Sequence, residues 1–219
     1  MSIPVIAIDG PSASGKGTIA RRLAAHFGFV HLDTGLLYRA VALAVLCAKA
    51  DPADAAAAEK AARELDGSTL LSGGDPALRE DATSRAASKV AAMPGVRAAL
   101  LKFQKDFCAT PPGGGPGAVL DGRDIGTVIA PQAPVKIYVT ASTETRAERR
   151  FKELQGRGEH VTYAAVLADM KERDERDVAR SIAPAKPADD AVILDTTNMT
   201  ADQAFSEALR IAEGRLGRG

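Results

Sequence analysis

Cysteine, tryptophan and long apolar runs are scarce in this chain of 219 residues. It has no tryptophan and two cysteines, Cys47 and Cys108, neither of which stands in a paired motif. A disulfide framework is therefore not expected, and a cytosolic location is the simplest interpretation. No run of about 18 apolar residues is present, which argues against a membrane-spanning helix. The start, MSIPVIAIDG, lacks the basic-then-apolar pattern of a signal peptide.

An excess of charge of either sign is also missing. Lysine and arginine total 28, aspartate and glutamate total 28, and the formal net charge is zero. A nucleic-acid-binding protein of this size is usually clearly basic, so no nucleic-acid partner is expected. The three histidines, His26, His31 and His160, show no spacing typical of metal ligands. Positive charge in this protein must therefore act locally, through its placement.

Hydrophobic residues make up 46% of the chain and recur in short runs. Continuous apolar runs of this kind are typical of strands buried on both faces. They predict strands at residues 4–9, 29–32, 118–121, 135–139 and 191–194. Helical patterns lie between them, at residues 17–26, 36–48, 143–155, 163–180 and 201–216. This alternation predicts an α/β protein with a mostly parallel five-stranded sheet wrapped by helices.

The alternation is interrupted between about residues 49 and 107. This segment is alanine-rich and charged, contains a turn at residues 72–76, and is predicted to be a helical insert with a small strand component. Residues 110–117 (TPPGGGPG) predict a flexible connection back to the core. Residues 156–160 separate two helical patterns, as the tip of a mobile lid would.

The most specific motif is Gly10-Pro11-Ser12-Ala13-Ser14-Gly15-Lys16-Gly17-Thr18. It follows a predicted strand and opens a predicted helix, which is the context that a phosphate-binding loop requires. Glycines let successive backbone N–H groups point at one anion, and the helix N-terminus adds unsatisfied donors. Lys16 can then reach the β- and γ-phosphates of a nucleoside triphosphate, and Thr18 is the expected Mg²⁺ ligand. A chance glycine-rich turn is the alternative, whereas a GTPase is disfavoured because the Asn-Lys-x-Asp base reader is missing.

A second group of polar residues follows the second and third predicted strands. Thr34 and Arg39 follow the second strand, and Asp121, Arg123 and Asp124 follow the third. Because the carboxyl ends of parallel strands meet at one edge, these residues are expected near the phosphate loop. A hydroxyl and a guanidinium suit a second phosphate, and Asp121 suits a carboxylate near Mg²⁺. The alternatives are an N-cap threonine, a surface arginine and an ordinary Asp-Gly turn.

A third cluster lies within residues 171–180 (KERDERDVAR). A helix there places Arg173, Asp177 and Arg180 on one face, with Arg176 beside it. Two arginines flanking one carboxylate suit a sugar phosphate. A solvated helix with i,i+4 ion pairs fits the same pattern.

Arginines also lead into the possible lid. Arg146, Arg149 and Arg150 lie on the predicted helix that precedes it. Such side chains can close over a transferring phosphoryl group and neutralise its charge. A solvated helix face is the alternative for each of them.

In combination, these segments resemble bacterial cytidylate kinases over almost the whole chain. The matching motifs are residues 6–18 (IAIDGPSASGKGT), 32–39 (LDTGLLYR), 121–127 (DGRDIGT), 134–138 (PVKIY) and 171–177 (KERDERD), followed by Arg180 and Ala183-Pro184. Residues 86–97 also look like that family's acceptor-binding insert, whereas residues 111–117 are longer and richer in glycine than is typical.

The resemblance implies a three-layer α/β/α P-loop kinase. Its core comprises residues 1–48, 108–148 and 163–219, its monophosphate-binding insert residues 49–107, and its small lid residues 149–162. Residues 10–18 are implied to bind ATP, with Mg²⁺ held by Thr18 and Asp121, partly through water. The residues expected to serve catalysis are Lys16, Arg123, Arg149 and Arg180.

The resemblance also implies the acceptor contacts. Ser88, Arg97 and Asp124 would read the cytosine, and Arg173 and Asp177 would hold the pentose. Thr34, Arg39, Arg123 and Arg180 would contact the acceptor phosphate.

The base assignment has an independent chemical rationale. Cytosine offers an N4 amino donor that the Asp124 carboxylate can accept, and its N3 and O2 acceptors suit Arg97. Uracil presents a carbonyl and an N3–H at the corresponding positions. The same pair is then mismatched, and each unpaired buried polar group costs about 1–3 kcal/mol. CMP and dCMP are therefore predicted over UMP.

The resulting hypothesis is ATP-dependent phosphorylation of CMP and dCMP in pyrimidine nucleotide metabolism, by a cytosolic monomer without nucleic-acid or membrane partners. A kinase for another acceptor, such as AMP, would share the phosphate loop but would not use Arg97 and Asp124 to recognise cytosine. A binding or regulatory module without transfer chemistry would not need a second site formed by Arg39, Arg123, Asp177 and Arg180.

Overall fold

The computed structural model describes residues 3–72, 75–180 and 182–217. Residues 73–74 of the predicted turn at 72–76 lie outside the described residues.

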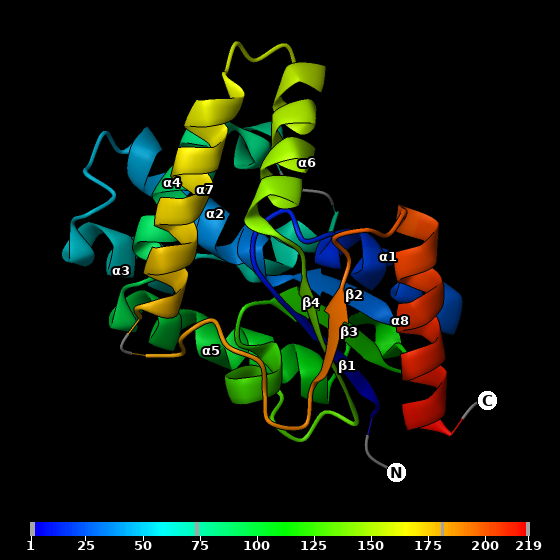
Figure 1. Ribbon diagram of the computed structural model, residues 1–219. Helices are drawn as coiled ribbons and strands as arrows, with labels where there is room; N and C mark the ends of the chain where they lie inside the picture. Colours follow the sequence, from blue (N-terminus) through cyan, green and yellow to red (C-terminus); the bar gives the residue numbers. More distant parts are fainter. Residues whose placement is uncertain (1–2, 73–74, 181, 218–219) are drawn as a thin grey trace.

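Five strands form one sheet whose carboxyl ends point upward in Figure 1. The strands are β1 (Val5–Asp9), β2 (Val30–Asp33), β3 (Ala118–Gly122), β4 (Val135–Thr140) and β5 (Val192–Asp195), in the spatial order β2-β3-β1-β4-β5. Every neighbouring pair is parallel. The predicted α/β class is confirmed, and each strand lies within one residue of its predicted bounds.

The central strands form because their residues suit burial on both faces of a sheet. All five residues of β1 (VIAID) and all five of β3 (AVLDG) are buried. Branched apolar side chains pack well on a pleated surface, and strands covered by helices on both faces keep continuous apolar character.

Helices cover both faces and make the predicted three layers. On one face α1 (Lys16–Phe27) and α8 (Ala201–Leu216) pack against a cluster that includes Ile6, Ile8 and Ile137. On the other face α5 (Pro94–Ala109) and the short π-helix η4 (Ile125–Ile129) enclose a cluster with Val5, Leu120 and other strand residues.

The insert is built around a core of its own. Its elements are α3 (Ala55–Glu64), the 3₁₀ helices η1 (Gly67–Ser72) and η2 (Pro76–Arg79), α4 (Asp81–Val90) and the first part of α5, and they pack on α2 (Thr34–Cys47), which precedes the insert. Leu37, Val41, Val90 and Leu100 are buried together there. The predicted strand component is wrong, since residues 49–72 and 75–107 contain helices only. Leu70 and Leu78 pack into this helical cluster instead of pairing with a sheet edge.

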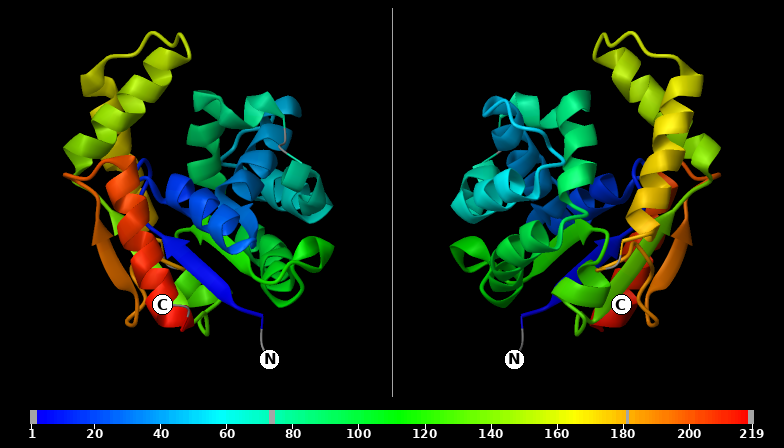
Figure 2. Two further views of the ribbon diagram at one scale, coloured as in Figure 1. Left: turned by 90° about the vertical axis from the view of Figure 1, so that its right-hand side faces the viewer. Right: turned by 90° about the vertical axis from the view of Figure 1, so that its left-hand side faces the viewer.

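A helical hairpin faces the insert. It consists of α6 (Thr143–Gly156), α7 (Tyr163–Val178) and the connection between them, where Gly158 adopts a φ of 78°. Figure 2 shows the hairpin and the insert rising on opposite sides above the carboxyl ends of the strands. The predicted helices at 17–26, 36–48, 143–155, 163–180 and 201–216 all exist, within two residues of their bounds.

The predicted domain limits remain predictions. The limit between residues 107 and 108 falls inside α5, and the predicted lid begins inside α6. The predicted flexible connection contains the short 3₁₀ helix η3 (Pro112–Gly114). Among the described helices, none is both long and apolar enough to cross a membrane.

Two isoleucines on neighbouring strands provide a test of where the core lies. Ile137 on β4 is 1% exposed and Ile193 on β5 is 53% exposed. We expect Ile137→Ala to lower the free energy of unfolding by about 2–5 kcal/mol, because it removes packed methylenes and leaves a cavity. Ile193→Ala should cost about 1 kcal/mol or less, since its side chain is half in solvent. Urea unfolding of both variants measures the difference, and equal losses would contradict this packing.

Candidate active site

Three strand ends meet at the carboxyl edge of the sheet. Asp121 on β3 is paired in register with Ile8 on β1 and with Asp33 on β2, and Asp9 is paired with Gly122. The parallel sheet therefore brings acidic side chains from three separate segments next to the phosphate loop that follows β1.

The phosphate loop depends on two glycine positions. Gly10 has a φ of 149°, and a Cβ there would lie 2.0 Å from the carbonyl oxygen of Val139. Gly15 has a φ of 93° and occupies the N-cap of α1, where it has no side chain to cap the helix. The first N–H groups of α1 are thus available to an anion.

Lys16 is the first residue of α1, and its surroundings disfavour its charged form. Its Nζ donates to the carbonyl oxygen of Pro11 at 3.2 Å. The pKa of Lys16 is lowered to about 7, mainly by burial and also by the nearby Arg123 guanidinium, while carboxylates such as Asp121 oppose the shift. A bound phosphate would supply the negative charge that stabilises the ammonium.

One cavity, called the main cavity here, extends from the loop to the insert. Its lining carries seven cationic and five acidic side chains. It contains Lys16 and the predicted acceptor-binding residues Thr34, Arg39, Ser88, Arg97, Arg123, Asp124, Arg173, Asp177 and Arg180. The structure therefore brings together residues from α1, α2, α4, α5, the β3–η4 turn and α7.

Arg123, Asp177 and Arg180 form the buried centre of this cavity. Arg123 donates from Nε to Asp177 Oδ2 at 2.9 Å, and Arg180 donates from Nη2 to Asp177 Oδ1. Burial alone would raise the pKa of Asp177, but Arg123, Arg180 and Arg173 outweigh it and hold that pKa below its ordinary value. A single carboxylate thus keeps two guanidiniums in place and leaves positive charge for an anionic ligand.

Arg173 and Arg39 add further positive charge. Burial and the neighbouring Arg123 lower the pKa of Arg173 to about 10, although Asp177 opposes the shift. Its Nε is buried and lacks a hydrogen-bond partner among the described residues. Arg39 donates to the carbonyl oxygen of Leu78 at 3.2 Å. Both side chains have donor capacity to offer a ligand.

Thr34 is oriented by the strand end rather than by the helix. Its hydroxyl donates to the backbone oxygen of Asp121 at 2.8 Å. The N-cap of α2 is Asp33, whose carboxylate accepts from the Gly35 N–H at 2.9 Å. The alternative interpretation of Thr34 as the N-cap is therefore wrong.

The other end of the main cavity is formed by a buried ion pair. Arg97 donates from Nη2 to Asp124 Oδ2, and both side chains are less than one-tenth exposed. Arg97 also donates to the carbonyl oxygen of Ala91 at 3.2 Å and lies 5.6 Å from the centre of the Tyr38 ring. This end of the cavity is thus lined by an aromatic ring, a carboxylate and a guanidinium.

Arg149 and Thr18 line a second cavity. This cavity is also bounded by Ser14, Ile19, Thr196, Met199, Thr200 and Ala204. Arg149 donates to the Thr196 carbonyl oxygen at 2.7 Å and to the Ser14 carbonyl oxygen at 3.4 Å. The structure places Arg149 beside the phosphate loop, but it does not bring Arg149 into the main cavity with Lys16, Arg123 and Arg180.

The donor set beside the loop fits Mg²⁺ bound together with a nucleotide. Hydroxyl and carboxylate oxygens of Thr18 and Asp121 are hard ligands that this ion prefers. Asp121 Oδ2 would lie only 3.5 Å from a Cβ at Gly17, which places it against the start of α1. Three histidine, cysteine or acidic side chains do not gather into a metal site among the described residues. Phosphate and water oxygens would therefore supply most of the ligands.

Three positioning contacts were not expected from the sequence. Asp9 accepts backbone N–H groups of η4, Arg176 donates to the Ser88 hydroxyl at 2.8 Å, and Arg146 donates to the Ser12 carbonyl oxygen at 3.4 Å. Arg146 is 5% exposed and also pairs with Asp174 at 2.6 Å, so it supports the loop from the hairpin. Asp9 is the last residue of β1, and Thr196, which accepts from Arg149, directly follows β5. Because ligands bind at the carboxyl ends of parallel strands, these positions are the signal that could have identified both residues.

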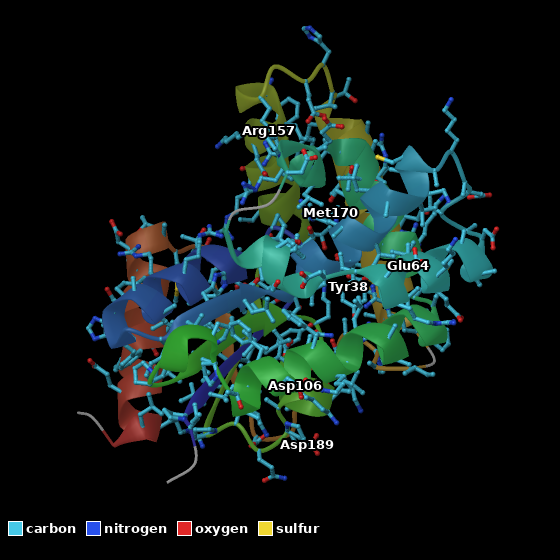
Figure 3. The ribbon with its side chains drawn as sticks, turned by 180° about the vertical axis from the view of Figure 1, so that it is seen from behind. Tyr38, Glu64, Asp106, Arg157, Met170 and Asp189 are labelled. Atoms are coloured by element: carbon cyan, nitrogen blue, oxygen red, sulfur yellow. The ribbon has the colours of Figure 1, made fainter. Side chains whose placement is uncertain are left out.

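The hairpin and the insert touch above the main cavity. Arg150 donates to Asp81 at 2.9 Å, and Arg157 donates to the Arg79 carbonyl oxygen at 2.6 Å. Figure 3 shows Arg157 on the hairpin, above the level of Tyr38. These two contacts join the hairpin to the insert.

The family model for cytidylate kinase matches residues 6–214. A cytidylate kinase of Paramagnetospirillum magneticum is 62% identical over 207 residues, covering 94% of this chain and 96% of the relative. Those of Xanthobacter autotrophicus and Methylobacterium sp. are each 60% identical, covering 96% and 98% of this chain and 98% and 100% of the relatives.

A solved structure supports the fold alone. An uncharacterised protein from Eubacterium ventriosum has a TM-score of 0.55 and 14% sequence identity, and the match covers 94% of this chain and 96% of that one.

The buried carboxyl group of Asp9 generates a prediction about stability. Burial raises its pKa from 3.8 to about 7, although two backbone N–H groups oppose the shift. The folded protein therefore keeps a proton that the unfolded chain releases, and stability is lost as the pH rises through about 7. Between about pH 4 and pH 8, wild type should lose on the order of a few kcal/mol relative to Asp9→Asn. Urea unfolding at a series of pH values measures this, and parallel profiles would contradict it.

Proposed function

The chain belongs to the cytidylate kinase family, and from this membership we propose that it transfers the γ-phosphoryl group of ATP to CMP and dCMP. The proposal rests on one observation, that two groups of residues suited to anions line the same cavity. One is the phosphate loop with Lys16, and the other is the cluster of Arg123, Asp177 and Arg180. A kinase needs both, since it must hold the donor and acceptor phosphates in line.

The donor side is assigned to the loop and the second cavity. The N–H groups at the start of α1 and the Lys16 ammonium bind the triphosphate, and the cavity beside Arg149, Thr196 and Met199 receives the nucleoside of ATP. Thr18 and Asp121 hold Mg²⁺, which when bound neutralises charge on the β- and γ-phosphates. The hydroxyl of Thr18 supports this assignment, because it lines that same second cavity at the loop.

The acceptor side is assigned to the main cavity. Asp124 bonds Arg97 through one oxygen, so its other oxygen can accept from the N4 amino group of cytosine. Arg97 retains donors for the N3 and O2 atoms, and Ser88 lies beside them in the lining. Arg173 and Asp177 contact the pentose, and Thr34, Arg39, Arg123 and Arg180 bind the 5′-phosphate.

Transfer itself requires alignment and charge neutralisation rather than a strong general base. Lys16, Arg123 and Arg180 surround the space between the two phosphates, and Arg149 lies at the far side of the loop. The hairpin and insert exclude water, which would otherwise hydrolyse ATP. A monomeric state and a cytosolic location belong to the proposal as well.

The proposed reaction is tested by an acceptor panel at constant ATP and Mg²⁺. ADP release should be stimulated strongly by CMP and dCMP, and at least about tenfold less, in kcat/KM, by UMP and AMP, because an unpaired buried polar group costs about 1–3 kcal/mol. A coupled assay of ADP release measures the rates. Lys16→Ala is the control for the phosphate loop, and its kcat should fall by orders of magnitude in a protein with an unchanged melting temperature.

Other outcomes of the same panel identify the alternatives. A preference for AMP would indicate a kinase with a different acceptor. ADP release that no monophosphate stimulates would indicate a binding or regulatory module.

The cytosine assignment predicts a selective defect for Asp124→Ala. Removal of the carboxylate leaves the N4 amino group and Arg97 unpaired, so kcat/KM for CMP should fall about 10- to 100-fold. The dissociation constant of ATP should stay within about twofold of wild type, because Asp124 lines only the acceptor side. Asp106→Ala is the matched control, since it removes the same group from an exposed pair with Lys102 on α5 (Figure 3). Equal losses of CMP and ATP binding would argue against Asp124 as the base reader.

A further inference from the structure

The segment Arg123–Asp124 must be held in one orientation, because its two side chains face different parts of the main cavity. Arg123 bonds Asp177 in the buried centre, and Asp124 bonds Arg97 at the aromatic end. The segment is a turn between β3 and η4, and Asp124 has the backbone angles φ −145° and ψ 25°. A turn with this conformation needs support from outside itself to carry two divergent side chains.

The first turn of η4 cannot obtain that support from its own N-cap residue. Asp124 occupies the N-cap position, where a carboxylate usually accepts the N–H groups that follow. Its carboxylate is used instead for Arg97. The N–H groups of Ile125 and Gly126 therefore need another acceptor, because both residues are buried.

Asp9 supplies that acceptor from a different strand. Its Oδ1 accepts from the Ile125 N–H and its Oδ2 from the Gly126 N–H, each at 2.8 Å. The register of β1 and β3 pairs Asp9 with Gly122, directly before the turn. Asp9 is 5% exposed and immediately precedes Gly10, the first residue of the phosphate loop. One carboxylate thus ties the acceptor-side turn to the strand that carries the donor-side loop.

Close packing makes this contact specific. A Cβ at Gly126 would lie 3.4 Å from Asp9 Oδ2 and 3.2 Å from Lys136 Cδ. The turn can approach Asp9 as it does because position 126 has no side chain. Small displacements of either partner would therefore be transmitted to the turn.

We propose that Asp9 is a positioning residue for the acceptor nucleotide, and that its carboxylate holds the Arg123–Asp124 turn in the orientation that the base and the 5′-phosphate require. The inference deepens the proposed function and rests on it. Asp9 is not part of the lining of the main cavity, whereas Arg123 and Asp124 are, so it would act through these two residues.

The energetics of Asp9 favour a positioning role over a purely structural one. Its burial raises its pKa to about 7, which means that its ionised form costs the folded state stability near neutral pH. A residue retained only for stability would avoid that cost. Groups that break a local energetic rule without a stabilising gain are found mainly at functional sites.

The test is the kinetics of Asp9→Asn with Asp54→Asn as its matched control. Asp54 also caps a helix through two backbone N–H groups, those of Ala56 and Ala57, but it is exposed at the start of α3. The assays are run at about pH 8, above the pKa of about 7 of Asp9, so that its carboxylate is ionised. In Asp9→Asn one N–H then faces an amide group that cannot accept, so the turn loses one charge-assisted bond. The KM for CMP should rise about tenfold or more, and the CMP-over-UMP ratio of kcat/KM should fall by a similar factor. The KM for ATP should change less than about twofold, and Asp54→Asn should match wild type.

A second variant approaches the same contact from the other side. Gly126→Ala leaves the Asp9 carboxylate intact but adds a Cβ 3.4 Å from Asp9 Oδ2 and 3.2 Å from Lys136 Cδ, so the contact must shift by a few tenths of an ångström. The same separation of the two KM values is expected, with a smaller size than in Asp9→Asn. This variant decides the question if Asp9→Asn does not fold.

The outcomes separate the inference from the proposed function. Unchanged kinetics in both variants, or a uniform loss for CMP and ATP alike, would overturn the positioning role while wild-type turnover of CMP leaves the reaction intact. A wild-type protein that does not phosphorylate CMP would overturn the reaction and the inference with it.

Discussion

The parallel pairing of β1 with β3, and of β3 with β2, is the constraint on which the site depends. Parallel strands all end at the same edge, so residues far apart in the chain become neighbours without any direct attraction between them. Asp9, Asp33 and Asp121 meet there, and the phosphate loop starts from the same edge. Helices α2 and α7 lie next to this edge and contribute Arg39, Arg173 and Asp177 to the main cavity.

The site concentrates positive charge in a protein whose formal net charge is zero. Burial disfavours the charged forms of Lys16 and Arg173, and the proximity of Arg123 adds to the effect. Asp177 offsets part of this cost by pairing with Arg123 and Arg180. An anionic ligand would relieve the remaining cost, so the same charges that weaken the folded state would favour its binding.

Much of the fold could be predicted from the sequence, because its strands are continuous apolar runs and its helices have clear periodicity. The insert was harder to predict, and the expected strand there is wrong because Leu70 and Leu78 find their apolar partners in a helical cluster. Thr34 lies in the main cavity, near the phosphate loop as expected. Its hydroxyl donates to the end of β3, however, and Asp33 caps the helix instead. Arg149 was expected with the catalytic cations, yet it lies at the second cavity. In each case the decisive partner is distant in sequence.

The sequence by itself determined the phosphate loop, since Gly10 and Gly15 permit backbone conformations that other residues rarely adopt, and Lys16 and Thr18 follow at fixed spacing. Local chain geometry is enough for this, and it needs no distant contact. Only the tertiary structure decided that Asp9 caps η4, that Arg97 pairs with Asp124, and that Arg176 reaches Ser88. These contacts join residues on different elements, and their geometry follows from strand register and helix packing, which no short segment of the chain encodes alone.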